Sequence, residues 1–113
     1  MAEVRIEGDE VVVHLSPMEK VGAVHGEPRA PLASVTGARA VADAWTELRG
    51  MRSPGTGFPG EMMLGTTRGQ FGRDFCAVSK HQGGVVVEME GQEFKRFLVS
   101  TDSSEQVVAA LGF

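Results

Sequence analysis

The segment that organises this chain reads Arg49-Gly-Met-Arg-Ser-Pro-Gly-Thr-Gly-Phe-Pro-Gly60. Its four glycines free some backbone dihedral angles and its two prolines fix others, so we expect neither an ordinary helix nor an ordinary strand. Two arginines and the aromatic residue Phe58 favour a loop of defined shape over a disordered one. The sequence therefore predicts a shaped loop over residues 49–60.

Upstream of this loop, residues 3–15 predict a β-hairpin with its turn at Gly8-Asp9. Pairing of Glu7 with Glu10 places one apolar set on a common face, as in a half-buried sheet: Val4, Ile6, Val11, Val13 and Leu15. The next residues, Ser16-Pro-Met-Glu19, predict a short helix, because serine caps it, proline takes its first position and the glutamate completes a capping box. We expect this helix to end near His25-Gly26.

The stretch from Leu32 to Asp43 leaves two alternatives open. Residues 37–42 suit a strand, but alanine is a poor strand former, so a helix is also compatible with the pattern. Residues 44–48 predict a short helical turn that leads into the loop.

Downstream of the loop, the pattern predicts strands at 61–67, 73–80, 85–90 and 93–100. The last two form a hairpin over Gly91-Gln92, in which Glu88 lies opposite Lys95. One face of that hairpin is apolar: Val85, Val87, Met89, Phe94 and Leu98. A final helix, capped by Asp102 or Ser103, has one side made of Ser104, Val107, Val108 and Leu111. The fold class is therefore α+β, a single domain over residues 1–113 built as a small antiparallel β-barrel of about seven strands, with a short helix after strand 2 and a C-terminal capping helix.

Charge and composition limit the classes of function. The net charge of −4 argues against general nucleic-acid binding, which needs a basic face. Charge is uneven, however, because residues 49–73 hold one acid, Glu61, and four arginines: Arg49, Arg52, Arg68 and Arg73. Cys76 is the single cysteine, the N-terminus lacks the layout of a signal peptide, and no apolar run is long enough for a membrane span. We therefore expect a cytoplasmic protein without a transmembrane segment.

The chain resembles the pleckstrin-homology-like (PH-like) domain proteins of high-GC Gram-positive bacteria. The resemblance covers nearly the whole chain and rests on these segments: 15–20 (LSPMEK), 31–35, 45–50 (WTELRG), the loop at 52–60, Gly65-Thr66, 85–87 and 94–96. It implies a seven-stranded barrel closed at one end by the last helix, and little chemistry, because no activity is established for that family. The lipid-binding PH pattern has a long basic loop between its first two strands, whereas Glu7-Gly-Asp-Glu10 is tight and acidic here. Phosphoinositide binding at that place is not expected.

The candidate binding residues are Arg49, Arg52, Gly55, Thr56, Gly57, Phe58, Arg68 and Arg73. Glycine N–H groups and arginine forks together suit a phosphate or a carboxylate. The alternative is a structural loop in which the arginines pair with nearby acids, namely Glu47, Glu61 or Asp74. Residues 55–60 also match the dinucleotide pattern GxGxxG, but the prolines and the following strand disfavour a nucleotide site.

Further side chains carry less chemistry. Arg96 lies in an apolar strand and is either a ligand contact or the partner of an internal acid such as Asp74 or Glu61. The three histidines lack metal spacing, and Cys76 fits a buried thiol better than a nucleophile. We therefore expect no cofactor and no enzymatic activity. The expected function is a binding or scaffolding domain with a protein partner or a second copy of itself, and the alternative is an anionic ligand or a membrane surface.

Overall fold

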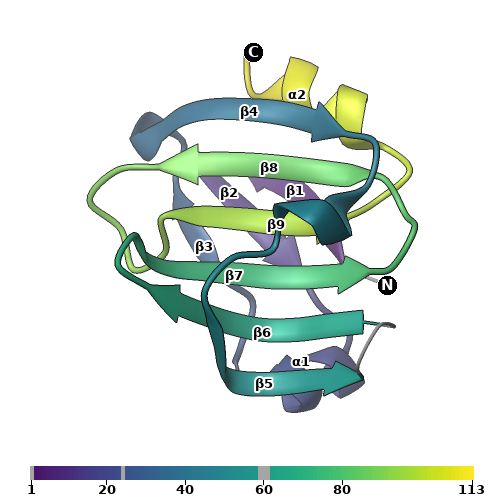
Figure 1. The fold of residues 1–113 in the computed structure, drawn as a ribbon. Coiled ribbons are helices and arrows are strands. Elements are labelled where there is room, and N and C mark those ends of the chain that lie inside the picture. The colour runs from purple at the N-terminus through teal and green to yellow at the C-terminus, as the bar shows by residue number, and fades with distance from the viewer. Residues whose placement is uncertain (1, 24, 59–61) are drawn as a thin grey trace.

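The computed structural model describes residues 2–23, 25–58 and 62–113, and for residues 52–58 it describes the backbone. These residues form an α+β fold made mostly of strands (Figure 1). The strands are β1 (Glu3–Glu7), β2 (Glu10–His14), β3 (Arg29–Pro31), β4 (Val35–Val41), β5 (Met51–Phe58), β6 (Met62–Gly69), β7 (Gly72–Ser79), β8 (Gly84–Met89) and β9 (Arg96–Ser100). The helices are α1 (Pro17–Ala23), α2 (Ser104–Ala110) and two short 3-10 turns, η1 (Leu32–Ser34) and η2 (Ala44–Glu47).

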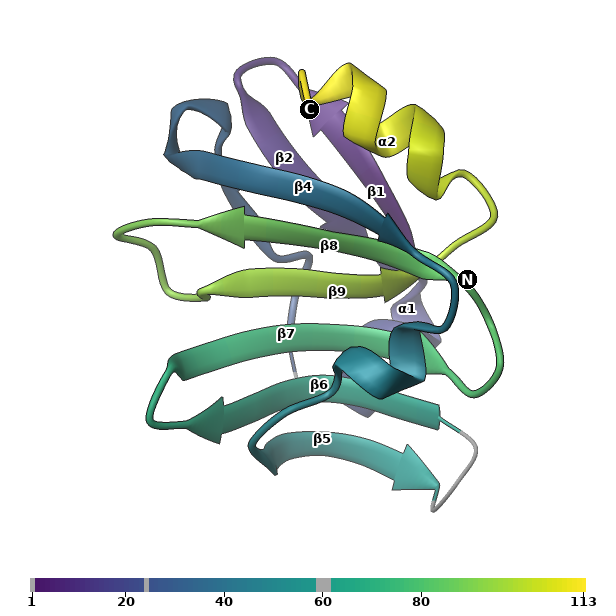
Figure 2. The ribbon, with the colours of Figure 1, turned by 45° about the horizontal axis from the view of Figure 1, so that its top comes forward.

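The strands belong to two sheets. One has three strands in the order β1-β2-β3, and the other has six in the order β4-β8-β9-β7-β6-β5. The smaller sheet lies behind the larger one, with α2 beyond β4 at one end and α1 beside β5 at the other (Figures 1 and 2). This arrangement buries the inner face of the large sheet and leaves β4 and β5 as its two end strands.

Two apolar clusters lie on the two faces of the six-stranded sheet. The larger fills the space between the sheets, and its fully buried members include Val11, Val13, Phe75, Val87 and Phe97. The smaller lies on the opposite face of the six-stranded sheet, where η2 covers it with Ala44, Trp45 and Leu48. Both faces of β7, β8 and β9 are therefore buried, which explains the continuous runs of apolar residues in these strands.

The predictions that depend on neighbouring residues are confirmed. Glu7 pairs with Glu10 in the first hairpin. Ser16 and Glu19 form the capping box, in which each backbone N–H donates to the other side chain, at 2.9 Å and 3.2 Å. For residues 37–42, where both a strand and a helix were left open, the structure has a strand, β4 over residues 35–41. The final helix packs its predicted side, including Val107, Val108 and Leu111, against the larger cluster.

The predicted loop at 49–60 is wrong for most of its length, since β5 runs from Met51 to Phe58 and pairs with β6. An end strand tolerates Pro54, because one of its edges has no neighbouring strand and a missing N–H there breaks no ladder hydrogen bond. The register also shifts between Arg52 and Gly55, as in a bulge. The remaining residues of that prediction, 59–61, lie outside the described ones.

The predicted β-barrel is not confirmed. Among the described residues, the large sheet has two open ends, β4 and β5. The described residues form nine strands instead of about seven. One pairing is also not antiparallel: β9 lies between β7 and β8 and runs parallel to β7. The coarser class, α+β with a short early helix and a C-terminal helix, is what the structure has.

The predicted register of the last hairpin is wrong by one residue. Glu88 pairs with Arg96 rather than with Lys95, because residues 90–95 form a wider connection than a two-residue turn. A one-residue slip exchanges the two faces of a strand. Phe97 therefore enters the core between the sheets, whereas Leu98 and Arg96 lie on the other face.

Candidate functional site

The structure divides the predicted binding residues among three places. Arg52, Gly55, Thr56, Gly57 and Phe58 belong to β5 and pair in register with residues 62–67 of β6. Arg49 precedes β5 and lies on the face of the sheet that η2 covers. Arg68 and Arg73 pair with each other across β6 and β7, one position from Thr67 and Asp74, so strand alternation places them on the opposite face. The eight residues therefore do not form one anion site.

Arg49 is part of a buried ion-pair network centred on Asp74. The Asp74 carboxylate is completely buried and accepts two hydrogen bonds from Arg49, at 2.7 Å and 2.9 Å, and one from Arg96 at 2.7 Å. Arg49 also stacks on the ring of Phe71, 3.9 Å from its centroid. The hydrogen bonds to Asp74 raise the pKa of Arg49 above its ordinary value. Asp74 is thus the predicted internal partner of both arginines.

The network continues to η2. Arg96, only 6% exposed, donates to the backbone carbonyl of Glu47. The Glu47 carboxylate in turn pairs with Arg39 of β4, and this hydrogen bond lowers the pKa of Glu47. Three arginines and two acids therefore join β4, η2, β7 and β9 on one face. The hydrogen bonds of Arg39 and Arg96 to Glu47 thus connect η2 to the six-stranded sheet.

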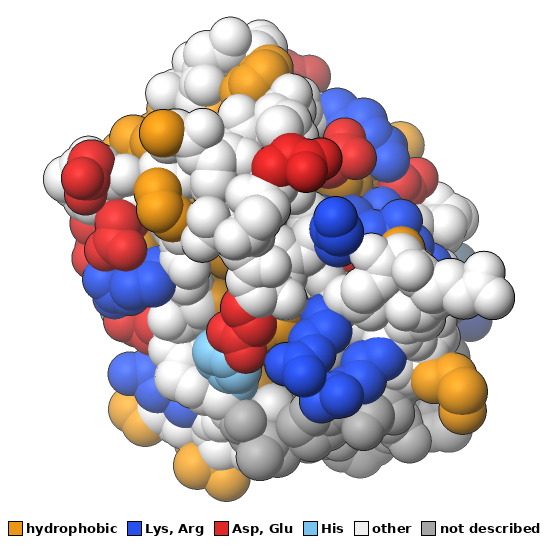
Figure 3. All heavy atoms as spheres, turned by 90° about the vertical axis from the view of Figure 1, so that its left-hand side faces the viewer, with side chains coloured by type: hydrophobic (Ala, Val, Ile, Leu, Met, Phe, Trp, Pro, Cys, Tyr) orange, Lys and Arg blue, Asp and Glu red, His pale blue; other side chains and the backbone are white. Residues whose placement is uncertain are grey.

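A group of cations lies at the β6–β7 turn. Arg68 and Arg73 are directly opposite each other, an arrangement in which like charges repel. Lys95 is close to Arg73, since its backbone N–H donates to the carbonyl of Arg73 at 2.6 Å and its side chain lies over Gly72. Arg73 approaches one acid, Glu93, at 3.7 Å. Lys and Arg side chains gather on this side of the molecule, next to a histidine and an acidic side chain (Figure 3).

Helix α1 and the end strand β5 carry exposed apolar side chains that the sequence did not predict. Met18 and Val21 of α1 are 84% and 79% exposed, and Met51, the first residue of β5, is 78% exposed. Helix α1 packs against β5 and β6. The three-residue spacing of Met18 and Val21 predicts that both lie on a similar side of this seven-residue helix. That spacing does not show whether this side packs against the sheet or faces solvent.

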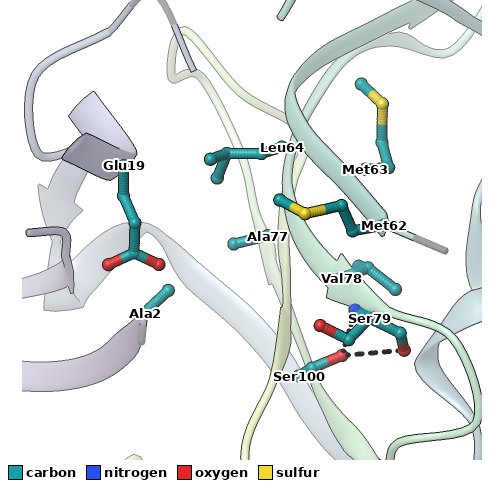
Figure 4. Close-up of a pocket in the computed structure, with 9 residues that line it drawn as sticks. All are labelled: Ala2, Glu19, Met62, Met63, Leu64, Ala77, Val78, Ser79 and Ser100. Carbon is teal, nitrogen blue, oxygen red and sulfur yellow. Dashed lines mark hydrogen bonds between the residues drawn. The ribbon is translucent and has the colours of Figure 1, made fainter. Parts of the chain in front are cut away.

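A small cavity lies between α1 and the ends of β6, β7 and β9 (Figure 4). Its volume is about 50 Å³, and Glu19, Ala2, Met62 and Leu64 are among its lining residues. Ser100 closes one side and exchanges hydrogen bonds with the backbone of Ser79. Small-molecule sites measure roughly 300–1,000 Å³, so this cavity has room for water only.

Two of the remaining candidate groups, Cys76 and His25, pack against other side chains. Burial raises the pKa of the Cys76 thiol to about 12, so Cys76 is the buried thiol that was predicted. His25 packs against Phe75 and Phe94, with ring centroids 5.6 Å and 5.4 Å apart. No group of three or more His, Cys, Asp or Glu side chains with metal-binding geometry is found among the described residues.

Comparisons of the chain with protein-family models, with curated proteins and with solved structures gave no match. None of the helices within residues 2–23, 25–58 and 62–113 has the length and apolar character that crossing a membrane requires. The geometry of the described residues is therefore the basis for assigning a function.

Proposed function

We propose that this chain is a non-enzymatic, PH-like binding domain that associates with a second copy of itself through β5 and the adjoining surface of α1. The observation that carries the proposal is the position of β5. It is an eight-residue strand at the end of the six-stranded sheet that begins with the exposed Met51, and it packs against α1, which carries the exposed Met18 and Val21.

An end strand is a template for strand addition, because one row of its backbone N–H and C=O groups has no partner within the sheet. Two copies of β5 related by a two-fold axis would join their large sheets and bring the two α1 helices together. Burial of an exposed Met or Val side chain stabilises an interface by roughly 1.5–3 kcal/mol. The apolar side chains of α1 would thus contribute most of the binding free energy. The backbone hydrogen bonds of β5 would fix the relative orientation of the two copies.

Light scattering behind gel filtration tests this association. The wild-type chain is expected to show a mass that rises with concentration. Val21→Glu is expected to weaken the association by about tenfold or more, since it places a charge where the dimer would bury the Val21 side chain. Ala109→Glu is the matched control, because Ala109 is also an exposed apolar residue of a helix and lies on α2, away from β5.

Hydrogen exchange locates the interface. Amides of β5 are expected to become more protected as the concentration rises, while those of β1 remain unchanged. A chain that stays monomeric at millimolar concentration, or an equal response of Val21→Glu and Ala109→Glu, would refute self-association through this surface.

The proposal also covers fold family, activity and compartment. A PH-like relationship is supported by the early hairpin, the short helix after β2 and the C-terminal helix, and the position of β9 departs from the expected antiparallel order. The absence of activity is supported by the buried, non-nucleophilic Cys76. A cytoplasmic location is supported by that residue being the single cysteine.

A second candidate function, binding of an anionic ligand, is favoured by the direct pairing of Arg68 with Arg73 beside Lys95. The positive charge that these side chains bring to one turn would attract an anion. Arg49 is not a useful probe of this function, because its removal also disturbs Asp74. The test is the shift in melting temperature produced by inorganic phosphate or by anionic vesicles, in the wild type and in the double variant Arg68→Ala with Arg73→Ala. A shift that the double variant keeps would exclude this site.

A further inference from the structure

A second surface lies on the other side of the molecule from β5, between β1 and α2. These elements run side by side (Figure 2). Their side chains line an open groove of about 270 Å³. Val4 and Ile6 line it from β1, and Ser103, Gln106, Val107 and Ala110 line it from α2. Ile6 was predicted to face the core with Val4, but it is 40% exposed because the groove uncovers it.

The backbone of β1 is open toward this groove. β1 is the end strand of the three-stranded sheet, and β2 is its partner on one side. Glu7 and Glu10 close a two-residue turn, so they form a hydrogen-bonded pair, and Arg5 repeats that arrangement with Val12. The intervening residues Val4 and Ile6 therefore direct their N–H and C=O groups away from β2.

No backbone hydrogen bond outside the β1–β2 ladder involves Glu3–Glu7 among the described residues. The two residues that line the groove with their side chains thus also offer free backbone donors and acceptors at its edge. An extended segment added to β1 would satisfy these groups and place alternate side chains in the groove.

The charge of the two segments that form the groove indicates which kind of peptide would bind there. Residues 2–10 and 101–113 together hold six acids and one arginine, a formal charge of −5, although the whole chain carries only −4. Two of these acids are paired with arginines, Glu3 with Arg5 at 2.8 Å and Glu10 with Arg29 at 3.1 Å, which leaves Glu7, Asp9, Asp102 and Glu105. The excess negative charge of the molecule is therefore concentrated on the two segments that form the groove, and the rest of the chain is close to neutral.

We propose that the groove between β1 and α2 binds an extended basic peptide, in which apolar side chains alternate with residues that include lysine or arginine. The peptide adds to β1 as an antiparallel strand. Its apolar side chains fill the space between Ile6 and Ala110, and its cations face the acids of the hairpin and of the α2 segment. This site is separate from β5, so it does not depend on self-association.

Two labelled peptides test the proposal. The first, acetyl-Lys-Thr-Val-Lys-Val-Thr-Lys-amide, has the expected chemistry, and the second replaces each lysine by glutamate. Fluorescence anisotropy is expected to show saturable binding of the basic peptide to the full chain, weakened by salt, and at least about tenfold weaker binding of the acidic one. Backbone amide shifts in NMR spectra are expected to change most at Val4, Ile6 and residues 103–110.

A matched pair of variants locates the site. Ala110→Arg inserts a bulky cation into the groove and is expected to weaken binding of the basic peptide by about tenfold or more. Ala109→Arg adds the same charge one residue away, outside the groove lining, and is expected to change the affinity by less than about threefold. Both positions are exposed on α2, so both variants should fold, which circular dichroism checks.

The proposal is overturned by absence of binding at millimolar peptide, by equal affinity for the two peptides, or by equal effects of the two variants. Val21→Glu is expected to leave peptide binding unchanged. Failure of self-association and failure of peptide binding are therefore distinguished in the same set of proteins.

Discussion

Replacement of Asp74 by alanine is expected to be among the most damaging single substitutions in this domain. Asp74 accepts three hydrogen bonds from two guanidinium groups and has no exposed surface. Its removal leaves Arg96, which is 6% exposed, without its closest anionic partner. Arg49 is less affected, since 40% of its side-chain surface is exposed and it is able to turn toward water.

The expected cost follows from that geometry. Breaking a buried ion pair by removal of one partner costs about 3–5 kcal/mol, which is a large part of the roughly 5–15 kcal/mol that stabilises an ordinary domain. Arg73→Ala provides the control. It removes an exposed pair with Glu93 at 3.7 Å and is expected to cost about 0–1 kcal/mol.

Urea denaturation followed by fluorescence measures both free energies. The single tryptophan, Trp45, lies in η2, whose last residue, Glu47, receives a hydrogen bond from Arg96. The double variant Asp74→Leu with Arg96→Met is expected to recover more than half of the lost stability, because it removes the orphaned charge as well. A cost below about 1 kcal/mol for Asp74→Ala would refute the reasoning.

Three further predictions concern pH, reactivity and backbone conformation. The hydrogen bond from the Leu15 N–H lowers the pKa of Glu27, so its stabilising contribution is present above its ordinary pKa and is lost as the pH falls through the lowered value; Glu27→Gln should remove that part of the acid-unfolding curve. Cys76, with a pKa of about 12, should resist thiol reagents at pH 8 until urea unfolds the chain. Gly50→Ala should lower the melting temperature more than Gly8→Ala. Both glycines have a positive φ, but a methyl group at Gly50 would lie 2.4 Å from a backbone oxygen of β6, whereas Gly8 has open space.

The elements that the sequence predicted correctly are those fixed by neighbouring residues. The first hairpin needs only its two-residue turn, and the capping box of α1 needs only Ser16 and Glu19. The face of α2 follows from its own periodicity. Each of these is decided within about ten residues, where turn chemistry and helical spacing are strong.

The errors concern partners that are distant in the chain. The position of β9 between β7 and β8 is a tertiary choice, and the wider connection at residues 90–95 shifted the register of Arg96. The glycines and Pro54 were interpreted as a loop, although an end strand accepts them. The predicted grouping of Arg49 with the other candidate residues was wrong for the same reason. Whether Arg49 faces solvent or the interior depends on Asp74 of β7, which lies 25 residues further along the chain.

The place of β9 has a consequence for how the protein is made. Residues 96–100 are the last strand to be synthesised, yet they lie inside the six-stranded sheet and connect β7 to β8. A nascent chain that ends before residue 96 has two unjoined half-sheets, and their facing edges remain open until β9 inserts between them. Assembly of this domain is therefore expected to wait until residues 96–100 have left the ribosome, and the pairing of segments far apart in sequence makes it slow.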